Sequence, residues 1–117
     1  MYGVPGCIGI RQGADKEDMT LREKQSRFVE CIGKLIVFAY ENGYELTFGD
    51  TYPGKFQHAE WGKHPQGLAI DLNLFRDGRY LETTEDHAPL GHYYESLDPN
   101  CIWGGRFSDG NHYQWGK

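Results

Sequence analysis

Two short stretches of this chain carry residue types that could bind a metal ion or move a proton. In the first, His64 comes shortly before residues 68–75, an apolar run whose even positions are all aliphatic and whose odd positions include Asp71. This alternation is typical of a half-buried strand with Asp71 on the face away from the core. An ionised carboxylate in such a strand is costly unless a cation meets it. A metal ion is one such partner, and a plain salt bridge is the alternative.

The second stretch lies closer to the C-terminus and adds another imidazole. His112 follows Asp109 by three residues. Two His and one carboxylate, with the fourth position left to water, form the ligand set of a catalytic zinc site rather than a structural one. We therefore expect one zinc ion held by His64, Asp71 and His112, with Asp109 left over as a spare acid. The alternative for Asp109 is a turn residue, because Asp-Gly pairs are common in turns for backbone reasons alone.

Together with their neighbours these residues form the pattern His64-x-x-Gly67-x-Ala69-x-Asp71, followed by Trp103-Gly104-Gly105 and Asp109-x-x-His112. The pattern resembles the zinc D-alanyl-D-alanine carboxypeptidases and L-alanyl-D-glutamate endopeptidases, which include phage endolysins. In that family the first His, the Asp and the last His bind zinc, and the acid three residues before the last His is the catalytic base. The resemblance spans roughly residues 45–113. It implies these roles for His64, Asp71, His112 and Asp109, a small antiparallel sheet backed by helices, and a peptidoglycan substrate.

The chain departs from the family's pattern around the substrate. Members often have an Arg upstream that helps to hold the substrate carbonyl or carboxylate, and residues 53–63 contain none. Lys55, Gln57 and His58 are candidates to bind substrate in its place. Members also usually have a Ser two residues before the first His and many have a Glu two residues after the last, where this chain has Gly62 and Gln114.

Aromatic side chains are a second group of candidate substrate-binding residues. Aromatic residues make up 15% of the chain, which suggests a surface able to grip a ligand. Trp61 and Trp103 are the candidates, and Tyr113 and Trp115 could line the same cleft. Packing in the core is the more common role of such side chains.

Composition limits the partners of this protein. Its 117 residues fit one domain, which we place at residues 19–117 after an N-terminal arm of residues 1–18. The formal charge of −5 and the lack of a basic cluster argue against nucleic acid. A negative protein is repelled by an anionic cell wall, so we expect the positive charges of Lys55 and Lys63 to offset this repulsion near the cleft. We expect a monomer.

Cysteine usage and the N-terminus indicate the compartment. The three cysteines are an odd number without a Cys-x-x-Cys pair, so we expect reduced thiols rather than a disulfide framework or a thiolate zinc site. No basic leader followed by an apolar run is present, and no segment approaches the roughly 20 apolar residues of a membrane span. We expect synthesis in the cytoplasm and action on the cell wall after lysis or assisted export.

The elements that must position these residues can be predicted from local patterns. A capping box of Thr20 and Glu23 opens a helix over residues 20–42, and Gly43 is the expected left-handed stop. Its predicted core stripe is Leu21, Phe28, Ile32, Leu35, Ile36 and Ala39. A strand over 44–52 and a loop over 53–66 lead into the strand at 68–75.

Further along the chain, Asp77-Gly78 predicts a tight hairpin turn into a short strand at 80–82. A helix over 85–97 with Thr84 as its cap follows, then a strand at 101–103 and a close backbone approach or a bulge at Gly104-Gly105. A last strand at 111–115 would bring His112 beside Asp71. The fold class predicted is α+β, a small antiparallel sheet with about two main helices packed on it and the zinc site at the sheet.

Three functions remain open at this point. The first is a zinc peptidase of peptidoglycan stem peptides, for which we favour an L-alanyl-D-glutamate endopeptidase over a D-alanyl-D-alanine carboxypeptidase because a small domain without an export signal suits a lysis enzyme. The second is a non-catalytic zinc-binding module, since signalling domains of the hedgehog type share the fold and keep the metal. The third is a metal-free domain that binds the cell wall.

Overall fold

The longest helix of this computed structural model, which describes residues 18–49 and 66–117, is α2 (Leu21–Glu41). Its first turn carries the predicted capping box. The Oγ1 of Thr20 accepts the N–H of Glu23 at 3.1 Å, and the Glu23 carboxylate accepts the N–H of Thr20 at 2.9 Å. Gly43, with φ +86°, follows the end of the helix. The predicted helix is therefore confirmed at both ends.

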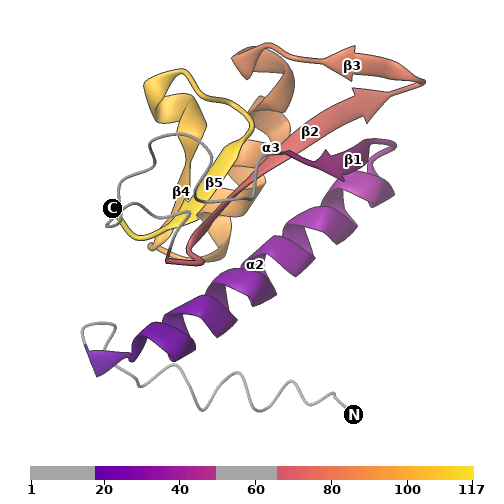
Figure 1. Ribbon diagram of the computed structural model, residues 1–117. Helices are drawn as coiled ribbons and strands as arrows, with labels where there is room; N and C mark the ends of the chain where they lie inside the picture. Colours follow the sequence, from indigo (N-terminus) through magenta and orange to yellow (C-terminus); the bar gives the residue numbers. More distant parts are fainter. Residues whose placement is uncertain (1–17, 50–65) are drawn as a thin grey trace.

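One face of α2 packs into the core, largely as the sequence pattern indicates. Phe28, Ile32, Leu35 and Ala39 are buried, and Ile36 is partly buried against them. Leu21 was predicted to share this stripe, but its side chain is 50% exposed. The reason is visible in Figure 1, where the first turns of α2 extend beyond the sheet. Leu21 fits the helical period of the stripe and is the first residue of α2.

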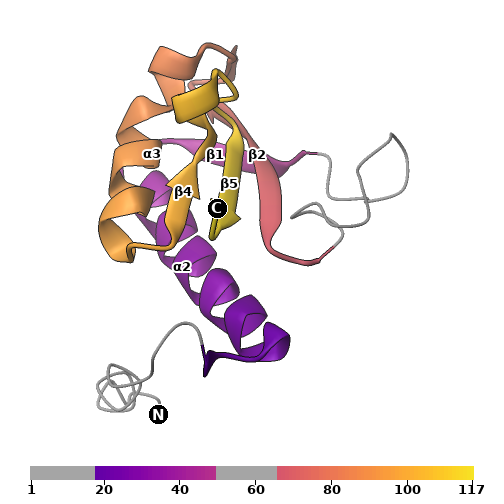
Figure 2. The same ribbon diagram turned by 90° about the vertical axis from the view of Figure 1, so that its left-hand side faces the viewer.

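The strands of the described chain form a five-stranded antiparallel sheet in the order β1-β2-β5-β4 (Figure 2), with β3 paired to the end of β2 (Figure 1). The strands are β1 (Glu45–Phe48), β2 (Ala69–Arg76), β3 (Arg79–Leu81), β4 (Cys101–Trp103) and β5 (His112–Trp115). The predicted α+β class is thus confirmed. β2 is the longest strand and the one that joins β1 and β3 to β5, so its register sets the relation of the two halves of the sheet.

The connections after β2 follow the predicted turn chemistry, with one correction. Asp77 and Gly78 both have positive φ, 54° and 77°, as a tight two-residue hairpin requires. The second helix, α3 (Thr84–Leu97), is capped by Thr83 rather than by Thr84. Thr83 is the residue three positions before Asp86, so its Oγ1 accepts the N–H of Asp86 at 3.0 Å while the Asp86 carboxylate accepts the N–H of Thr83.

The core lies between the sheet and the two helices. Leu72 and Leu74 of β2 and Tyr113 of β5 are at most 1% exposed and pack against side chains of α2 and α3.

Cys31 and Cys101, from α2 and β4, are buried free thiols that hydrogen-bond to each other, and this bond and burial raise the pKa of Cys101. Cys7 and all but the last residue of the predicted N-terminal arm lie outside the described residues. Within residues 18–49 and 66–117, no helix is long and apolar enough to cross a lipid bilayer.

Two buried tyrosines, Tyr94 on α3 and Tyr113 on β5, differ in how their hydroxyl groups are satisfied. Their rings meet edge to face with centroids 5.3 Å apart. The Tyr94 hydroxyl donates to the Gln114 carbonyl at 2.7 Å, whereas the Tyr113 hydroxyl has no partner among the described residues. Burial raises the pKa of both phenols, so both stay protonated near neutral pH.

We therefore predict opposite outcomes for two matched substitutions. Tyr94→Phe removes a donor from a buried carbonyl and should lower the free energy of unfolding by about 1–2 kcal/mol. Tyr113→Phe removes an unsatisfied buried hydroxyl and should leave stability unchanged or raise it by up to about 1 kcal/mol. Urea unfolding of both variants checks this. A larger loss for Tyr113→Phe than for Tyr94→Phe would contradict the assignment.

Candidate functional site

The register of β2 with β5 places two of the predicted zinc ligands side by side. Asp71 and His112 are directly paired across these strands, and the His112 Nδ1 lies 3.2 Å from the Asp71 Oδ1. Both side chains project from the face of the sheet opposite the helices, because their strand neighbours Ile70, Leu72 and Tyr113 face the core. The prediction that the last strand brings His112 beside Asp71 is confirmed.

The separation of these two donor atoms fits a shared metal ion. Two donors on one tetrahedral zinc ion, each about 2.0–2.2 Å from it, lie about 3.3–3.6 Å apart. A charge-assisted N–H···O bond is shorter, about 2.7–2.9 Å. The observed 3.2 Å lies at the long end of the range for N–H···O hydrogen bonds and just below the spacing of two zinc ligands, so it is compatible with both. An imidazole nitrogen and a carboxylate oxygen are also donor types that zinc prefers, so the pair fits a zinc site on both spacing and chemistry.

The same face also carries Ala69 and Phe75 of β2, and we give the name polar face to its polar side chains: Thr47, Asn73, Asp71, His112 and Gln114. The Gln114 Oε1 lies 2.8 Å from the His112 Nε2, and the Gln114 amide nitrogen donates to the Gly116 carbonyl. On the other side of Asp71, the Asn73 amide donates to the Thr47 hydroxyl at 3.3 Å. The polar face therefore crosses three strands, with Asp71 and His112 at its centre.

Negative groups around His112 alter its proton affinity. Burial alone would lower the pKa of His112, which is 8% exposed. Hydrogen bonds with Asp71 and Gln114 and the charges of Asp71 and Asp109 outweigh burial, so the pKa of His112 is raised above its ordinary value. The site thus favours positive charge at this position, which is the electrostatic condition for holding a cation.

Asp109, the predicted base, lies at the surface on a tightly held backbone. Its side chain is exposed, while its N–H donates to the Gly104 carbonyl at 2.9 Å and its carbonyl accepts the N–H of His112 at 3.1 Å. Gly104 begins the 3-10 helix η2 (Gly104–Phe107), and a Cβ there would clash with the Asp109 carbonyl and come within 2.7 Å of the His112 Cβ. The predicted close backbone approach is confirmed, and it ties Asp109 to His112.

Trp103 supports this loop from within the core. Its side chain is 6% exposed, and its Nε1 donates to the Gly110 carbonyl at 2.7 Å. Its ring is packed so closely against Gly91 and Gly105 that a Cβ at either position would overlap it. We predicted Trp103 as a substrate-binding residue, but the structure places it in the core, where it positions the Asp109 loop. Tyr113 and Trp115, at 0% and 3% exposure, are core residues as well.

Glu95 is a supporting residue that the sequence patterns did not indicate. Its carboxylate on α3 accepts the N–H of Trp103 at 2.9 Å and is also paired with the Arg106 guanidinium at 2.7 Å. Burial would raise the pKa of Glu95, but these two hydrogen bonds outweigh it and lower the pKa. Glu95 therefore ties β4 and η2 to α3 as an anion. Only the tertiary structure shows this, because no local motif joins the three residues.

The remaining predicted residues lie outside the described residues: His64, the third zinc ligand, and Lys55, Gln57, His58 and Trp61. Within residues 18–49 and 66–117 no group of three or more His, Cys, Asp or Glu side chains could hold a metal ion, so this part of the chain brings together two of the three predicted ligands. The described chain before His64 is hydrogen-bonded to Asp71, and the described chain after it is hydrogen-bonded to α2. Gly49 donates its N–H to the Asp71 carbonyl at 2.8 Å, and the Gln66 carbonyl accepts the Gln25 amide at 2.6 Å.

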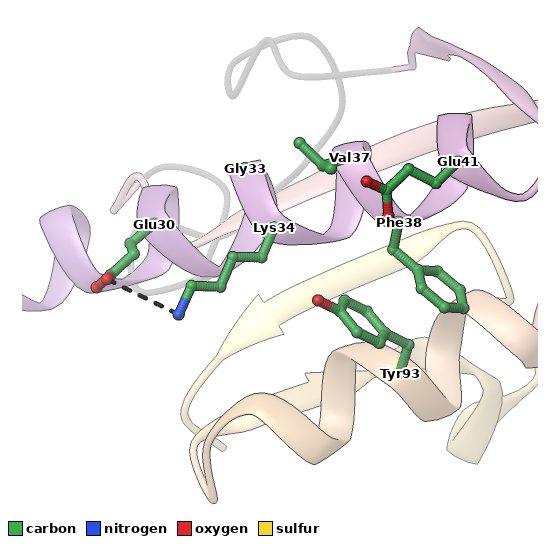
Figure 3. A pocket seen from close by; sticks show the side chains of 7 residues that line it. All are labelled: Glu30, Gly33, Lys34, Val37, Phe38, Glu41 and Tyr93. Atoms are coloured by element: carbon green, nitrogen blue, oxygen red, sulfur yellow. Dashed lines mark ion pairs between the residues drawn. The ribbon is translucent and has the colours of Figure 1, made fainter. Parts of the chain in front are cut away.

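A groove is lined by residues of α2 and by Tyr93 of α3 (Figure 3). Val37 and Glu41 of α2 line it, and Phe38 and Tyr93 stack across the helix pair with ring centroids 4.1 Å apart. None of the predicted site residues contributes to it. The groove thus offers no alternative location for the predicted chemistry.

Comparison with models of protein families and with curated proteins finds no match for this chain.

Gly104→Ala should disturb the site through its backbone. The added Cβ must displace the Asp109 carbonyl or the His112 side chain, and we expect a loss of about 1–3 kcal/mol in the free energy of unfolding together with weaker metal binding. Gly33→Ala is the matched control, because its Cβ would have nothing within 4 Å on the exposed side of α2. That variant should gain about 0.5–1 kcal/mol and bind metal as the parent does. Equal stability of the two variants would refute the close approach.

His87 should make stability depend on pH in a defined direction. It is 3% exposed, its Nε2 donates to the Leu81 carbonyl at 3.0 Å, and its Nδ1 has no partner among the described residues. Burial lowers the pKa of His87, and the Leu81 carbonyl and the charges of Asp86 and Asp109 only partly offset this. Between this lowered pKa and the unfolded value of about 6.5, only the unfolded chain takes up the proton, so stability falls as pH falls.

A His87→Gln variant, which keeps an amide donor for the Leu81 carbonyl, should lose less stability over the same pH range. The difference between the two proteins should approach about 1.4 kcal/mol for each tenfold reduction in the proton affinity of His87. Urea unfolding at a series of pH values from 7.5 to about 5, with a chelator present throughout, measures it. Parallel pH profiles for the two proteins would show that His87 titrates normally in the folded state.

Proposed function

We propose that this protein is a zinc metallopeptidase that hydrolyses an amide bond in peptidoglycan stem peptides. The observation that carries the proposal is the pairing of Asp71 and His112 at 3.2 Å on the polar face. These residues come from strands 41 positions apart in the chain, and their spacing suits two ligands of one zinc ion. His64 is proposed as the third ligand. The motif resemblance supports peptidoglycan as the substrate and, as the activity, cleavage of the bond between L-Ala and D-Glu.

In this proposal the residues of the chain have separate tasks. Asp71, His112 and His64 hold the ion, and the chemistry that zinc supplies in such sites is acidification of water and polarisation of a carbonyl. Asp109 takes the proton of the attacking water and passes it to the leaving amine as the amide bond breaks. Its exposed side chain and anchored backbone suit this task, because the carboxylate can reach solvent while its position relative to His112 stays constant. No covalent intermediate with the protein is needed.

The proposed setting is the bacterial cell wall, which the protein reaches after lysis or by assisted export, acting as a monomer. Two readings compete with the endopeptidase. A D-alanyl-D-alanine carboxypeptidase would use the same ligands and base and differ in the bond it cuts. A non-catalytic zinc module would keep the Asp71–His112 pair and show no hydrolysis.

The decisive experiment compares two matched acid-to-amide variants. Asp109 and Asp77 each precede a Gly in a turn, and both are exposed. With purified peptidoglycan, Asp109→Asn should bind one zinc ion but release fragments roughly 100- to 10,000-fold more slowly than the parent, as expected for a lost general base. Asp77→Asn should retain full activity, because it lies in the β2–β3 turn away from the polar face.

Metal analysis and mass spectrometry of the released fragments complete this test. New amino termini on D-Glu would support the endopeptidase, and released D-Ala would support the carboxypeptidase. A zinc-loaded parent that is inert on every peptidoglycan tried would eliminate catalysis and leave the binding module. Failure of the parent to bind zinc would remove the proposal altogether.

A further inference from the structure

Gln114 lies beside the candidate ligand His112, and each end of its side-chain amide has a hydrogen-bond partner. Its amide nitrogen donates to the Gly116 carbonyl at 2.5 Å. A carbonyl oxygen can only accept, so this contact requires the NH₂ end of the Gln114 amide to face Gly116. The Oε1 end then faces the His112 Nε2, at 2.8 Å. The orientation of the amide is thus set by the backbone rather than by the imidazole.

This orientation determines which nitrogen of His112 carries a proton. An amide oxygen only accepts, so the His112 Nε2 must be the donor in the contact with Gln114. In the neutral ring the other nitrogen, Nδ1, then has a lone pair and no hydrogen. That lone pair points at the Asp71 carboxylate, 3.2 Å away. Two acceptors at this distance repel each other unless a proton or a metal ion lies between them.

We propose that Gln114 is a positioning residue that holds neutral His112 in the tautomer whose Nδ1 can bind the metal ion together with Asp71. The inference rests on the proposed zinc function and deepens it. Metal-binding His residues commonly donate their second N–H to an oxygen acceptor, which sets the tautomer and the ring orientation. Here that acceptor is two residues along the same strand, on the same face. Gln114 touches neither zinc nor substrate and acts only through His112.

The first test reads the tautomer directly, in the full chain with a chelator present. Long-range ¹⁵N–¹H NMR of protein labelled at its five His residues separates the two neutral tautomers, at a pH high enough for the imidazole to be neutral. The parent should show His112 with its hydrogen on Nε2. Gln114→Leu should shift His112 toward a mixture of tautomers. Gln114→Glu, whose carboxylate can still accept the same N–H, should restore the parent signal.

The second test measures zinc affinity by competition with a chelator of known affinity. Gln114→Leu should weaken zinc binding by about 10- to 100-fold, the usual effect of losing such an acceptor, and Gln114→Glu should recover most of the loss. Asn73→Leu is the matched control. Asn73 stands two residues beyond Asp71 as Gln114 stands two beyond His112, on the same face, but its amide bonds Thr47 and not the imidazole. This control should bind zinc as the parent does.

The outcomes separate this inference from the proposed function. If Gln114→Leu leaves both the His112 tautomer and the zinc affinity unchanged, or if Asn73→Leu weakens zinc binding equally, the role of Gln114 is refuted while zinc binding by the parent still stands. If the parent shows the Nε2–H tautomer but binds no zinc, the proposed function fails and with it the role of Gln114 toward a metal. A parent with the hydrogen on Nδ1 overturns the inference at once.

Discussion

The antiparallel register between β2 and β5 is the constraint on which the candidate site depends. Side chains alternate between the two faces of a strand, so a shift of one residue would place His112 in the core and Tyr113 opposite Asp71. The register is held from the core side by the burial of Leu72 and Tyr113 and by the bond from the Tyr94 hydroxyl to the Gln114 carbonyl. Hydrophobic packing on one face therefore decides which polar groups meet on the other.

A second set of contacts fixes the position of the loop that carries Asp109 relative to the sheet. The Trp103 indole lies in the core, where its Nε1 holds the Gly110 carbonyl, and the Glu95 carboxylate holds the Trp103 backbone. Gly104 lets the loop backbone approach closely enough to connect Asp109 with His112. A buried aromatic side chain, Trp103, thus helps to position the predicted base and a predicted ligand from within the core.

Local sequence signals predicted the elements well where each signal is complete within a few residues. The Thr20–Glu23 capping box, the Asp77-Gly78 turn and the alternation in β2 all correspond to the observed elements, because each depends on backbone geometry over one turn or one strand. The predicted cap of α3, Thr84, was wrong. Thr83 and Thr84 are adjacent, and only Thr83 has Asp86 three residues after it to complete the capping box. The prediction also missed the exposure of Leu21, which depends on where the sheet ends.

The sequence by itself determined the α+β class, the candidate residues Asp71, Asp109 and His112, and the strand face of Asp71, because residue type and two-residue periodicity are local properties. The sequence predicted that His112 comes to lie beside Asp71, but only the tertiary structure decided the register that makes them direct cross-strand partners, the place of Trp103 in the core, and the contact of Gln114 with His112. These facts depend on contacts between segments far apart in the chain or on the direction of a side-chain amide. Such contacts arise from how the buried faces pack together, and no short stretch of sequence contains that information.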